Sequence, residues 1–217
     1  MLARLALTAL TATATVTTVL ASTAPIAAAD PCPDVELVFA RGTAEPPGLG
    51  RVGDALAAAL QPLLGGRSLG TYAVNYPASY NFLSTRNGAD DAAGHIAWMA
   101  DACPETQTVL GGFSQGASAV AMLAGVAPIG DRIGSIGSAQ PLPPELTGRI
   151  AAVAVFGNPS SRFGSPLSAA GQFADRTIDV CSSGDPICSA GRDRSAHSNY
   201  ELPPYPGQAA GFIAGRL

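Results

Sequence analysis

The sequence predicts an α/β fold whose central parallel sheet is covered by helices on both faces. Three observations lead to this fold class. Short apolar segments alternate along the chain with segments of helical spacing, as in repeated strand–helix–strand units. The clearest of these apolar segments are hydrophobic throughout, as expected of strands buried on both faces. No internal repeat and no linker divides the chain beyond its N-terminal segment, so we expect one domain.

The first four elements alternate between strand and helix. Residues 35–40 are an apolar run that ends at Arg-Gly, which predicts a buried strand. Apolar residues recur at helical spacing over residues 52–64 and stop at two glycines, which predicts a helix. Residues 72–76 are predicted as the second strand, ended by a proline. Residues 87–102 are predicted as a helix, with two aspartates in the first turn, where the helix dipole favours them.

The second half of the chain continues the alternation. Residues 108–113 are predicted as the third strand, and the alanine-rich residues 115–126 as the helix that follows it. A stretch rich in glycine, proline and serine is then expected to be mostly irregular. Residues 150–156 are the clearest buried strand, residues 177–181 the fifth strand, and residues 207–216 a short final helix. These elements together predict a five-stranded parallel sheet.

The composition excludes several classes of protein. Hydrophobic residues make up 47% of the 217 residues, which is enough for a large core, while charged residues make up only 13%. The formal net charge is −4, so the chain lacks the positive surface that a nucleic-acid binder needs. Nothing in the sequence is typical of a coiled coil, a collagen or a multi-span membrane protein.

The N-terminal segment has the pattern of a secretory signal peptide. It opens with one positive charge, Arg4, continues as an apolar run to Leu20, and reaches the small-residue pair Ala27-x-Ala29. We expect cleavage after Ala29, which leaves residues 30–217 as the mature, exported domain, free in the medium or associated with the cell wall. An uncleaved membrane anchor is the alternative, but threonines dilute the apolar run and the cleavage site follows it directly.

The four cysteines predict two disulfides. An even number of cysteines in an exported chain favours a disulfide framework, and four cysteines allow three pairings. Cys181 and Cys188 are close enough in the sequence to close a small loop, and Cys32 would then bind Cys103. A zinc site is the alternative, but there is no Cys-x-x-Cys pair and there are only 2 histidines, so we expect no metal and no cofactor.

A nucleophile elbow is predicted at Gly112-Phe113-Ser114-Gln115-Gly116. This Gly-x-Ser-x-Gly pattern follows a predicted strand and precedes a predicted helix, which is the setting that the elbow requires. Ser114 would then stand at the carboxyl edge of the sheet, where open α/β folds bind ligands. The alternative is a tight strand–helix turn with a capping serine, which is how most chance matches arise.

A serine nucleophile needs a base and an acid. His95 lies inside a predicted helix, where a structural role is expected, whereas His197 follows the last strand, where this fold class carries its catalytic histidine. Asp185 is the preferred acid because it lies just past a strand and inside the loop that Cys181 and Cys188 would close. The acids that also qualify by chain order are Asp131, Glu145, Asp175, Asp179 and Asp193.

The oxyanion hole requires the backbone N–H of the residue after the nucleophile, which is Gln115, and a second donor. Thr43 is the candidate for the second donor, because it lies in the loop after the first strand and offers both an N–H and a hydroxyl. A helix-capping role is the alternative, but the next predicted helix begins too far away to favour it.

Taken together, these segments resemble the cutinase family of serine esterases. The elbow reads Gly111-Gly112-Phe113-Ser114-Gln115-Gly116 after a proline-containing lead, and the clamp reads Cys181-Ser-Ser-Gly-Asp185-Pro-Ile-Cys188, followed by a histidine. The segments Arg41-Gly42-Thr43-x-Glu45 and Val74-Asn75-Tyr76-Pro77-Ala78 are also similar to family segments. Arginine without lysine and an alanine-rich composition suggest the actinobacterial branch of the family.

The resemblance implies a small, lidless α/β-hydrolase. We expect the protein to be a monomer that needs no cofactor. It implies a catalytic triad of Ser114, Asp185 and His197, and an oxyanion hole formed by Thr43 and Gln115. It also implies the disulfide pairs Cys32–Cys103 and Cys181–Cys188.

One departure from the family pattern concerns the substrate. Between the second clamp cysteine and the histidine the family usually has an apolar pair, but here the sequence has Arg192, Asp193 and Arg194. We expect a charged lip that disfavours polymeric or aggregated lipid, and hence a secreted esterase for short- to medium-chain esters. The alternatives are an esterase for acetylated polysaccharide, a lipase or phospholipase, and a wall-associated binding protein that has lost its activity.

Overall fold

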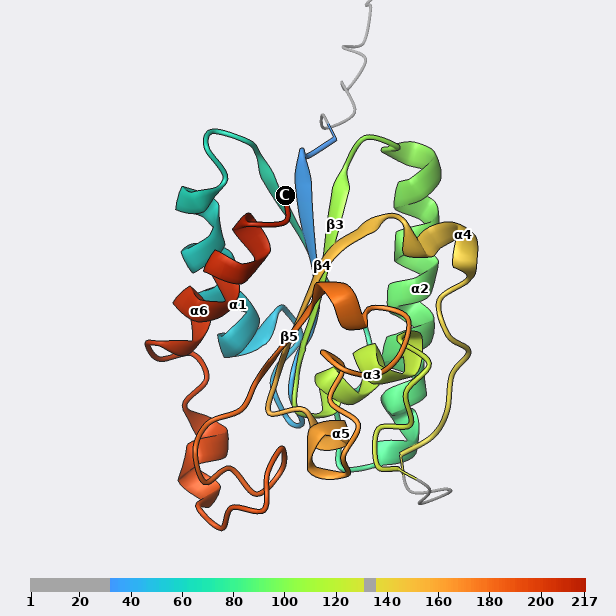
Figure 1. Ribbon diagram of the computed structural model, residues 1–217. Coiled ribbons are helices and arrows are strands. Elements are labelled where there is room, and N and C mark those ends of the chain that lie inside the picture. Colours follow the sequence, from blue (N-terminus) through green and yellow to red (C-terminus); the bar gives the residue numbers. More distant parts are fainter. Residues whose placement is uncertain (1–31, 131–135) are drawn as a thin grey trace, which may run out of the picture. The chain divides into compact units, whose positions relative to one another are not determined.

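Five parallel strands form one sheet in the order β2-β1-β3-β4-β5 (Figure 1). A computed structural model describes residues 32–130 and 136–217. The strands are β1 (Val35–Ala40), β2 (Leu69–Ala73), β3 (Gln107–Phe113), β4 (Ile150–Phe156) and β5 (Thr177–Val180). The predicted α/β class with a five-stranded parallel sheet is confirmed.

The strand order places a topological switch between β1 and β3. From β1 the chain continues outward to β2 on one side, and then crosses to β3 on the other side. The loops that leave β1 and β3 therefore diverge at their carboxyl ends, where doubly wound sheets form their ligand crevice. The loop 41–45 follows β1 and Ser114 follows β3, so the order of the strands brings the two predicted parts of the site to this crevice.

Helices cover both faces of the sheet, as Figure 1 shows. On one face α1 (Gly50–Leu60) packs beside α6 (Tyr205–Ala214), and on the other α2 (Thr85–Ala102) packs beside α3 (Gln115–Leu123). The remaining helices are short: the 3₁₀ helices η1 (Gln61–Leu63), η2 (Phe82–Ser84), η3 (Ala174–Arg176) and η4 (Arg194–Ser198), and the α-helices α4 (Pro144–Thr147) and α5 (Pro159–Arg162).

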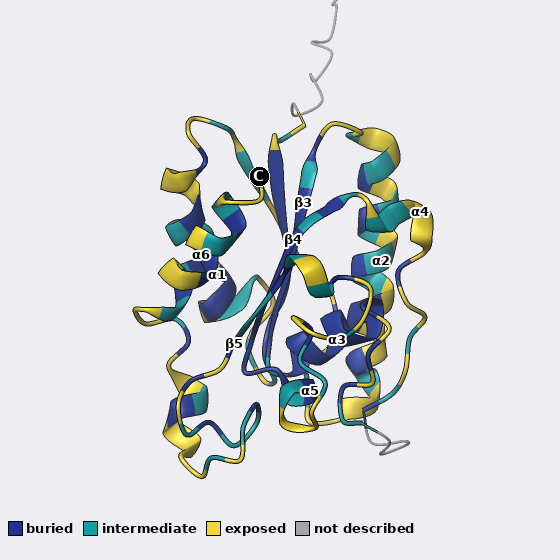
Figure 2. Ribbon diagram, in the orientation of Figure 1, coloured by how far each residue is buried: buried dark blue, intermediate teal, exposed yellow. Residues whose placement is uncertain are grey.

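The core consists of two apolar layers, one on each face of the sheet. In β1, Leu37 and Phe39 pack with Leu56 of α1 in one layer, while Val38 packs with Ile96 of α2 in the other. This alternation is the period of two that strand side chains follow. Figure 2 shows the outer sides of the helices as exposed, and the strands β1, β3 and β4 are almost wholly buried, whereas β2 is only partly buried.

The strand β2 differs from its predicted position at residues 72–76. It pairs with β1 over Leu69–Ala73, and the chain leaves the sheet after Val74. The carbonyl groups of Val74 and Tyr76 accept hydrogen bonds from the Arg41 guanidinium instead of from a neighbouring strand. The Arg41 side chain, from the loop after β1, thus takes the place of the hydrogen bonds that a neighbouring strand would make. The local hydrophobicity of residues 72–76 could not predict this contact.

The structure has two disulfides. Cys32–Cys103 joins the segment that precedes β1 to the residue after α2, and its Cα atoms are 5.6 Å apart. Cys181–Cys188 closes a loop of sequence separation 7 directly after β5. In the described part of the chain, no helix is long and apolar enough to cross a membrane.

Candidate active site

Ser114 lies on a strained turn between β3 and α3. Its backbone has φ +53° and ψ −111°, a conformation that residues other than glycine rarely adopt. The turn is tight: a Cβ atom on Gly112 would lie 2.5 Å from the backbone of Gly116, and a Cβ on Gly116 would lie 1.9 Å from the carbonyl oxygen of Ala40. Both glycines of the pattern are therefore required by backbone packing, as in a nucleophile elbow.

Three side chains form a continuous line of hydrogen bonds. His197 Nε2 lies 2.8 Å from Ser114 Oγ, and His197 Nδ1 lies 2.8 Å from Asp185 Oδ2. The three residues come from different loops at the carboxyl edge of the sheet: the β3–α3 turn, η4, and the loop after β5. The imidazole can thus take the Ser114 proton on one nitrogen while the carboxylate holds the N–H of the other.

The carboxylate of Asp185 is fully buried inside the loop closed by Cys181–Cys188. Its Oδ1 accepts a hydrogen bond from the Ile187 N–H at 2.7 Å, and its Oδ2 accepts one from the Tyr200 hydroxyl at 2.5 Å. With the bond to His197 the carboxylate has three hydrogen-bond donors, which fix its position and stabilise its negative charge.

These hydrogen bonds determine the ionisation of Asp185 and of its donor Tyr200. Burial raises the pKa of Asp185, but the hydrogen bonds from His197, Tyr200 and the Ile187 N–H outweigh burial and bring the pKa below its usual value. Burial and the bond to Asp185 raise the pKa of the Tyr200 hydroxyl well above its usual range. At neutral pH Asp185 is therefore a carboxylate, and Tyr200 is a protonated donor.

Tyr200 is a residue of the site that the sequence analysis missed. It is buried, its ring packs near those of Phe113 and His197, and the Ser182 N–H donates to its hydroxyl at 2.9 Å. A tyrosine three residues after the proposed base was a weak signal in the sequence, because its partner Asp185 is reached only through the fold.

The two oxyanion candidates lie together. The Thr43 hydroxyl donates to Gln115 Oε1 at 3.1 Å, and Gln115 Nε2 donates to the Thr85 hydroxyl at 3.0 Å. Gln115 is the first residue of α3, so its backbone N–H has no acceptor within that helix. The loop before Thr43 is held by Arg41 and by the Gly42 N–H, which donates to the Glu45 carboxylate.

Ser114 and His197 open into a cavity of about 770 Å³. Thr43 and Gln115 also line it. Much of the remaining wall is apolar or aromatic: Tyr80, Phe82, Phe113, Ile129, Ile136, Pro159, Phe163, Pro186 and Ile187. A cavity of this size, with a few polar groups at one point of its wall, suits a small substrate with an apolar chain.

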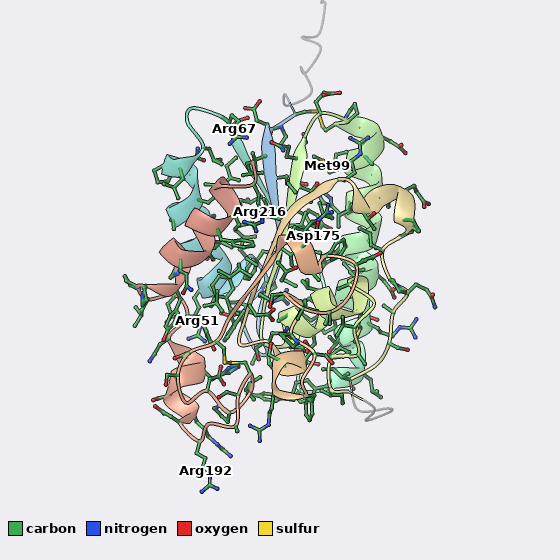
Figure 3. The ribbon with its side chains drawn as sticks, viewed as in Figure 1. Arg51, Arg67, Met99, Asp175, Arg192 and Arg216 are labelled. Atoms are coloured by element: carbon green, nitrogen blue, oxygen red, sulfur yellow. A yellow bond between two sulfur atoms is a disulfide. The ribbon has the colours of Figure 1, made fainter. Side chains whose placement is uncertain are left out.

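The structure does not place Arg192, Asp193 and Arg194 at this cavity. None of the three lines it, and Figure 3 shows Arg192 extending away from the molecule. The Asp193 N–H donates to the carbonyl of Gly184 at 2.9 Å, and its carboxylate accepts from the Ser195 N–H at 2.9 Å, which starts η4. The segment that was expected to form the lip thus folds against the loop closed by Cys181–Cys188 and does not line the cavity.

The other acids and the second histidine lie elsewhere. His95 on α2 contacts Glu36 at 3.0 Å and stacks on Tyr72 at a centroid distance of 3.5 Å. Asp179 accepts hydrogen bonds from Asn158, Ser161 and the Ser168 N–H. None of Glu145, Asp175, Asp179 and Asp193 lines the cavity, and Asp131 lies outside the described residues.

Comparisons with known proteins identify the family of this chain. The family model described as Cutinase matches residues 31–217. The chain is 50% identical to "Phospholipase Culp4" of Mycobacterium tuberculosis over 86% of this chain and 80% of that protein. It is 43% identical to "Carboxylesterase Culp1" of the same organism, over 87% and 84%. A Trichoderma reesei cutinase solved with a phosphonate inhibitor is similar in structure, with a TM-score of 0.67 and 34% identity over 86% and 77% of the two chains.

Proposed function

Because this chain belongs to the cutinase family, we propose that Ser114, His197 and Asp185 are the nucleophile, the base and the acid of its reaction. The chain is a cutinase-like carboxylesterase, so the reaction is hydrolysis of a carboxylic ester. The observation that carries the residue assignment is the line of two 2.8 Å hydrogen bonds from Ser114 through His197 to Asp185, which opens into the cavity.

The mechanism follows from this line. Ser114 Oγ attacks the ester carbonyl while its proton passes to His197 Nε2, and Asp185 stabilises the imidazolium that forms. Collapse of the tetrahedral intermediate breaks the ester C–O bond, and His197 gives the proton to the leaving alcohol. A water molecule then attacks the acyl-enzyme by the same route, which releases the acid and restores Ser114.

We propose that the Gln115 N–H and Thr43 bind the oxyanion. Thr43→Val keeps the volume of the side chain but removes the hydroxyl that positions Gln115, so we expect kcat to fall roughly 10²-fold with little change in KM. Thr43→Ser, which keeps the hydroxyl, is the matched control and retains most of the activity. Steady-state kinetics on p-nitrophenyl butyrate measure both variants, and a loss below threefold in Thr43→Val would contradict the role.

We propose that Tyr200 positions Asp185. Tyr200→Phe removes a donor to a charged group, so we expect kcat to fall about tenfold with KM little changed. Tyr205→Phe is the control, since the Tyr205 hydroxyl donates to Ser182 and not to Asp185. Equal losses of activity in the two variants would contradict a positioning role.

The pH dependence of stability provides a second test of Tyr200. A carboxyl whose pKa is lowered by folding stabilises the protein above its ordinary pKa of about 4, and this contribution is lost as the pH falls. Tyr200→Phe removes one cause of the lowered pKa. The difference in unfolding free energy between wild type and variant is therefore largest near neutral pH and narrows toward pH 3, as measured by urea unfolding.

We propose short- to medium-chain esters as substrates. The apolar wall of the cavity supports an acyl chain, and the relatives named as a carboxylesterase and a phospholipase support ester bonds of lipid type. We expect kcat/KM on a p-nitrophenyl ester series to peak between butyrate and octanoate. Strict preference for acetate would instead indicate an acetyl esterase.

We also propose that the protein is exported as residues 30–217. The two disulfides and the family fit an extracellular protein. The segment 1–29, which falls outside the described residues, is proposed as a signal peptide. Intact mass of the protein recovered from culture medium should give an N-terminus at Asp30, and a chain that keeps Met1 in the membrane fraction would contradict the proposal.

A further inference from the structure

Among the described residues, the charged side chains at the active-site cavity have one sign. The chain has 16 acidic residues and 12 arginines, yet the described residues that line the cavity include two arginines, Arg51 and Arg162, and no carboxylate. A positively charged substrate cavity favours anionic ligands, because the low-dielectric walls of a cavity strengthen the field of its charges.

The two arginines differ in how far their charge is compensated. Arg51 lies 3.3 Å from the carboxylate of Glu45 and 3.6 Å from that of Glu201, and it also donates to the carbonyl of Ser198. With two acids beside it, Arg51 contributes little net charge to the cavity.

Arg162 keeps its charge. Its Nη1 donates to the carbonyl of Pro186 at 2.7 Å and to the carbonyl of Ser189, and neutral carbonyl groups hold a guanidinium in place without cancelling its charge. Its Nε and Nη2 have no partner among the described residues. These two nitrogens form the edge of the guanidinium that can donate parallel hydrogen bonds to two oxygens of one anion.

Arg162 lies at the cavity and contacts the loop that carries Asp185. It ends α5, and the carbonyls it binds belong to the loop that carries Asp185. Pro186 and Ile187 of that loop line the same cavity as Ser114. In the described part of the chain, the cavity thus combines the proposed nucleophile, an apolar wall and one arginine, Arg162, that is held in place without an acidic partner.

We propose that Arg162 binds an anionic oxygen group of the substrate, so that the enzyme selects amphiphilic esters that carry a negative charge near the scissile ester. The group is a phosphodiester or a carboxylate, both of which match the guanidinium edge. The apolar wall, including Phe82 and Phe163, takes the hydrocarbon part. This inference rests on the proposed esterase function and adds a specificity residue to it.

The simpler role for Arg162 is structural, since Nη1 tethers the loop that holds Asp185. The two roles predict different results. Loss of a tether disturbs Asp185 and slows every ester by the same factor, whereas loss of a cation slows the anionic esters more than the neutral ones. Arg162→Lys keeps the charge but not the guanidinium edge, so it separates the two roles further.

The test compares matched esters in the purified protein. One pair is p-nitrophenyl hexanoate and the mono-p-nitrophenyl ester of adipate, which differ by a terminal carboxylate. The other is dihexanoylglycerol and dihexanoylphosphatidylglycerol below their aggregation limits, which differ by a phosphodiester. For each pair the measured quantity is the ratio of kcat/KM for the anionic ester to that for the neutral ester.

We expect Arg162→Gln to lower this ratio about tenfold in at least one pair, and Arg162→Lys to retain most of it. The pair that responds identifies the anion as carboxylate or phosphodiester. Raising the salt concentration should lower the ratio in wild type and have less effect in Arg162→Gln. Arg192→Gln, an exposed arginine that does not line the cavity, is the control and should leave both ratios unchanged.

Two results would overturn the inference. An equal loss of kcat/KM on neutral and anionic esters in Arg162→Gln would assign Arg162 a tethering role alone, and no loss of kcat/KM on any of the esters would exclude both an anion site and a tethering role. Either result leaves turnover of the neutral esters by the wild type intact. Failure of the proposed function is different, because the wild type would then hydrolyse none of the four esters.

Discussion

Ser114→Ala is expected to lower kcat for p-nitrophenyl butyrate by at least about 10⁴-fold while the protein stays folded. The variant removes the only atom that attacks the ester in the proposed mechanism, and His197 then has no nucleophile to activate. The Ser114 hydroxyl has no structural bond to lose except the one to His197 among the described residues. Stability measured by thermal unfolding should therefore change little.

A matched control separates the nucleophile from buried serines in general. Ser160 is also buried, and its hydroxyl has no hydrogen-bond partner among the described residues. Ser160→Ala should retain activity. A fluorophosphonate should label wild type and Ser160→Ala at Ser114, as read by peptide mass spectrometry, and should not label Ser114→Ala. Turnover that persists in Ser114→Ala, or a label on another residue, would refute the assignment of Ser114 as the nucleophile.

Asp185→Asn is expected to lower kcat about 10⁴-fold with a small change in KM. The amide has nearly the same volume, but it carries no charge to stabilise the imidazolium, and its NH₂ group favours the wrong imidazole tautomer. His197 then presents its proton to Ser114 instead of accepting one. The loss should persist at neutral and alkaline pH, since the pKa of Asp185 is below its usual value and the wild-type group is ionised throughout.

Asp179→Asn is the control for this prediction. Asp179 qualifies by chain order as well as Asp185 does, and it also accepts three hydrogen bonds, from Asn158, Ser161 and the Ser168 N–H. We expect Asp179→Asn to lower the unfolding temperature while kcat stays within a few-fold of wild type. A comparable loss of kcat in both variants would show that the Asp185 effect arises from loss of structure and not from the triad.

Local backbone chemistry explains why the elbow and the sheet could be predicted. The tight turn at Ser114 requires glycine at positions 112 and 116, so the residues that determine the turn lie within a few positions of one another in the sequence. The strand β4 has the predicted bounds because its residues are apolar throughout and its neighbours on both sides complete its hydrogen bonds.

The features that could not be predicted depend on contacts between distant segments. The Tyr200 hydroxyl contacts Asp185 only once the loop closed by Cys181–Cys188 has folded. The Arg162 side chain is likewise held beside the cavity by carbonyl groups of a distant segment, those of Pro186 and Ser189. The short helix α5 did leave a local signal, since Asn158 caps it and Pro159 opens it, but four residues were too few to show helical periodicity. The expectation of a charged lip at Arg192 shows the opposite case. This segment lies near His197 in the sequence, but it does not line the cavity.

The packing of α1 beside α6 has a consequence for the order in which the folded enzyme assembles. Helix α1 is made early and α6 after every other described element, yet Leu56 of α1 and Ile213 of α6 belong to one apolar layer. A nascent chain therefore carries an uncovered apolar face until α6 docks. His197 lies shortly before α6 in the chain, so the base reaches Ser114 at the same late stage. Burial of that face and assembly of the proposed triad are thus expected to depend on the same last part of the chain.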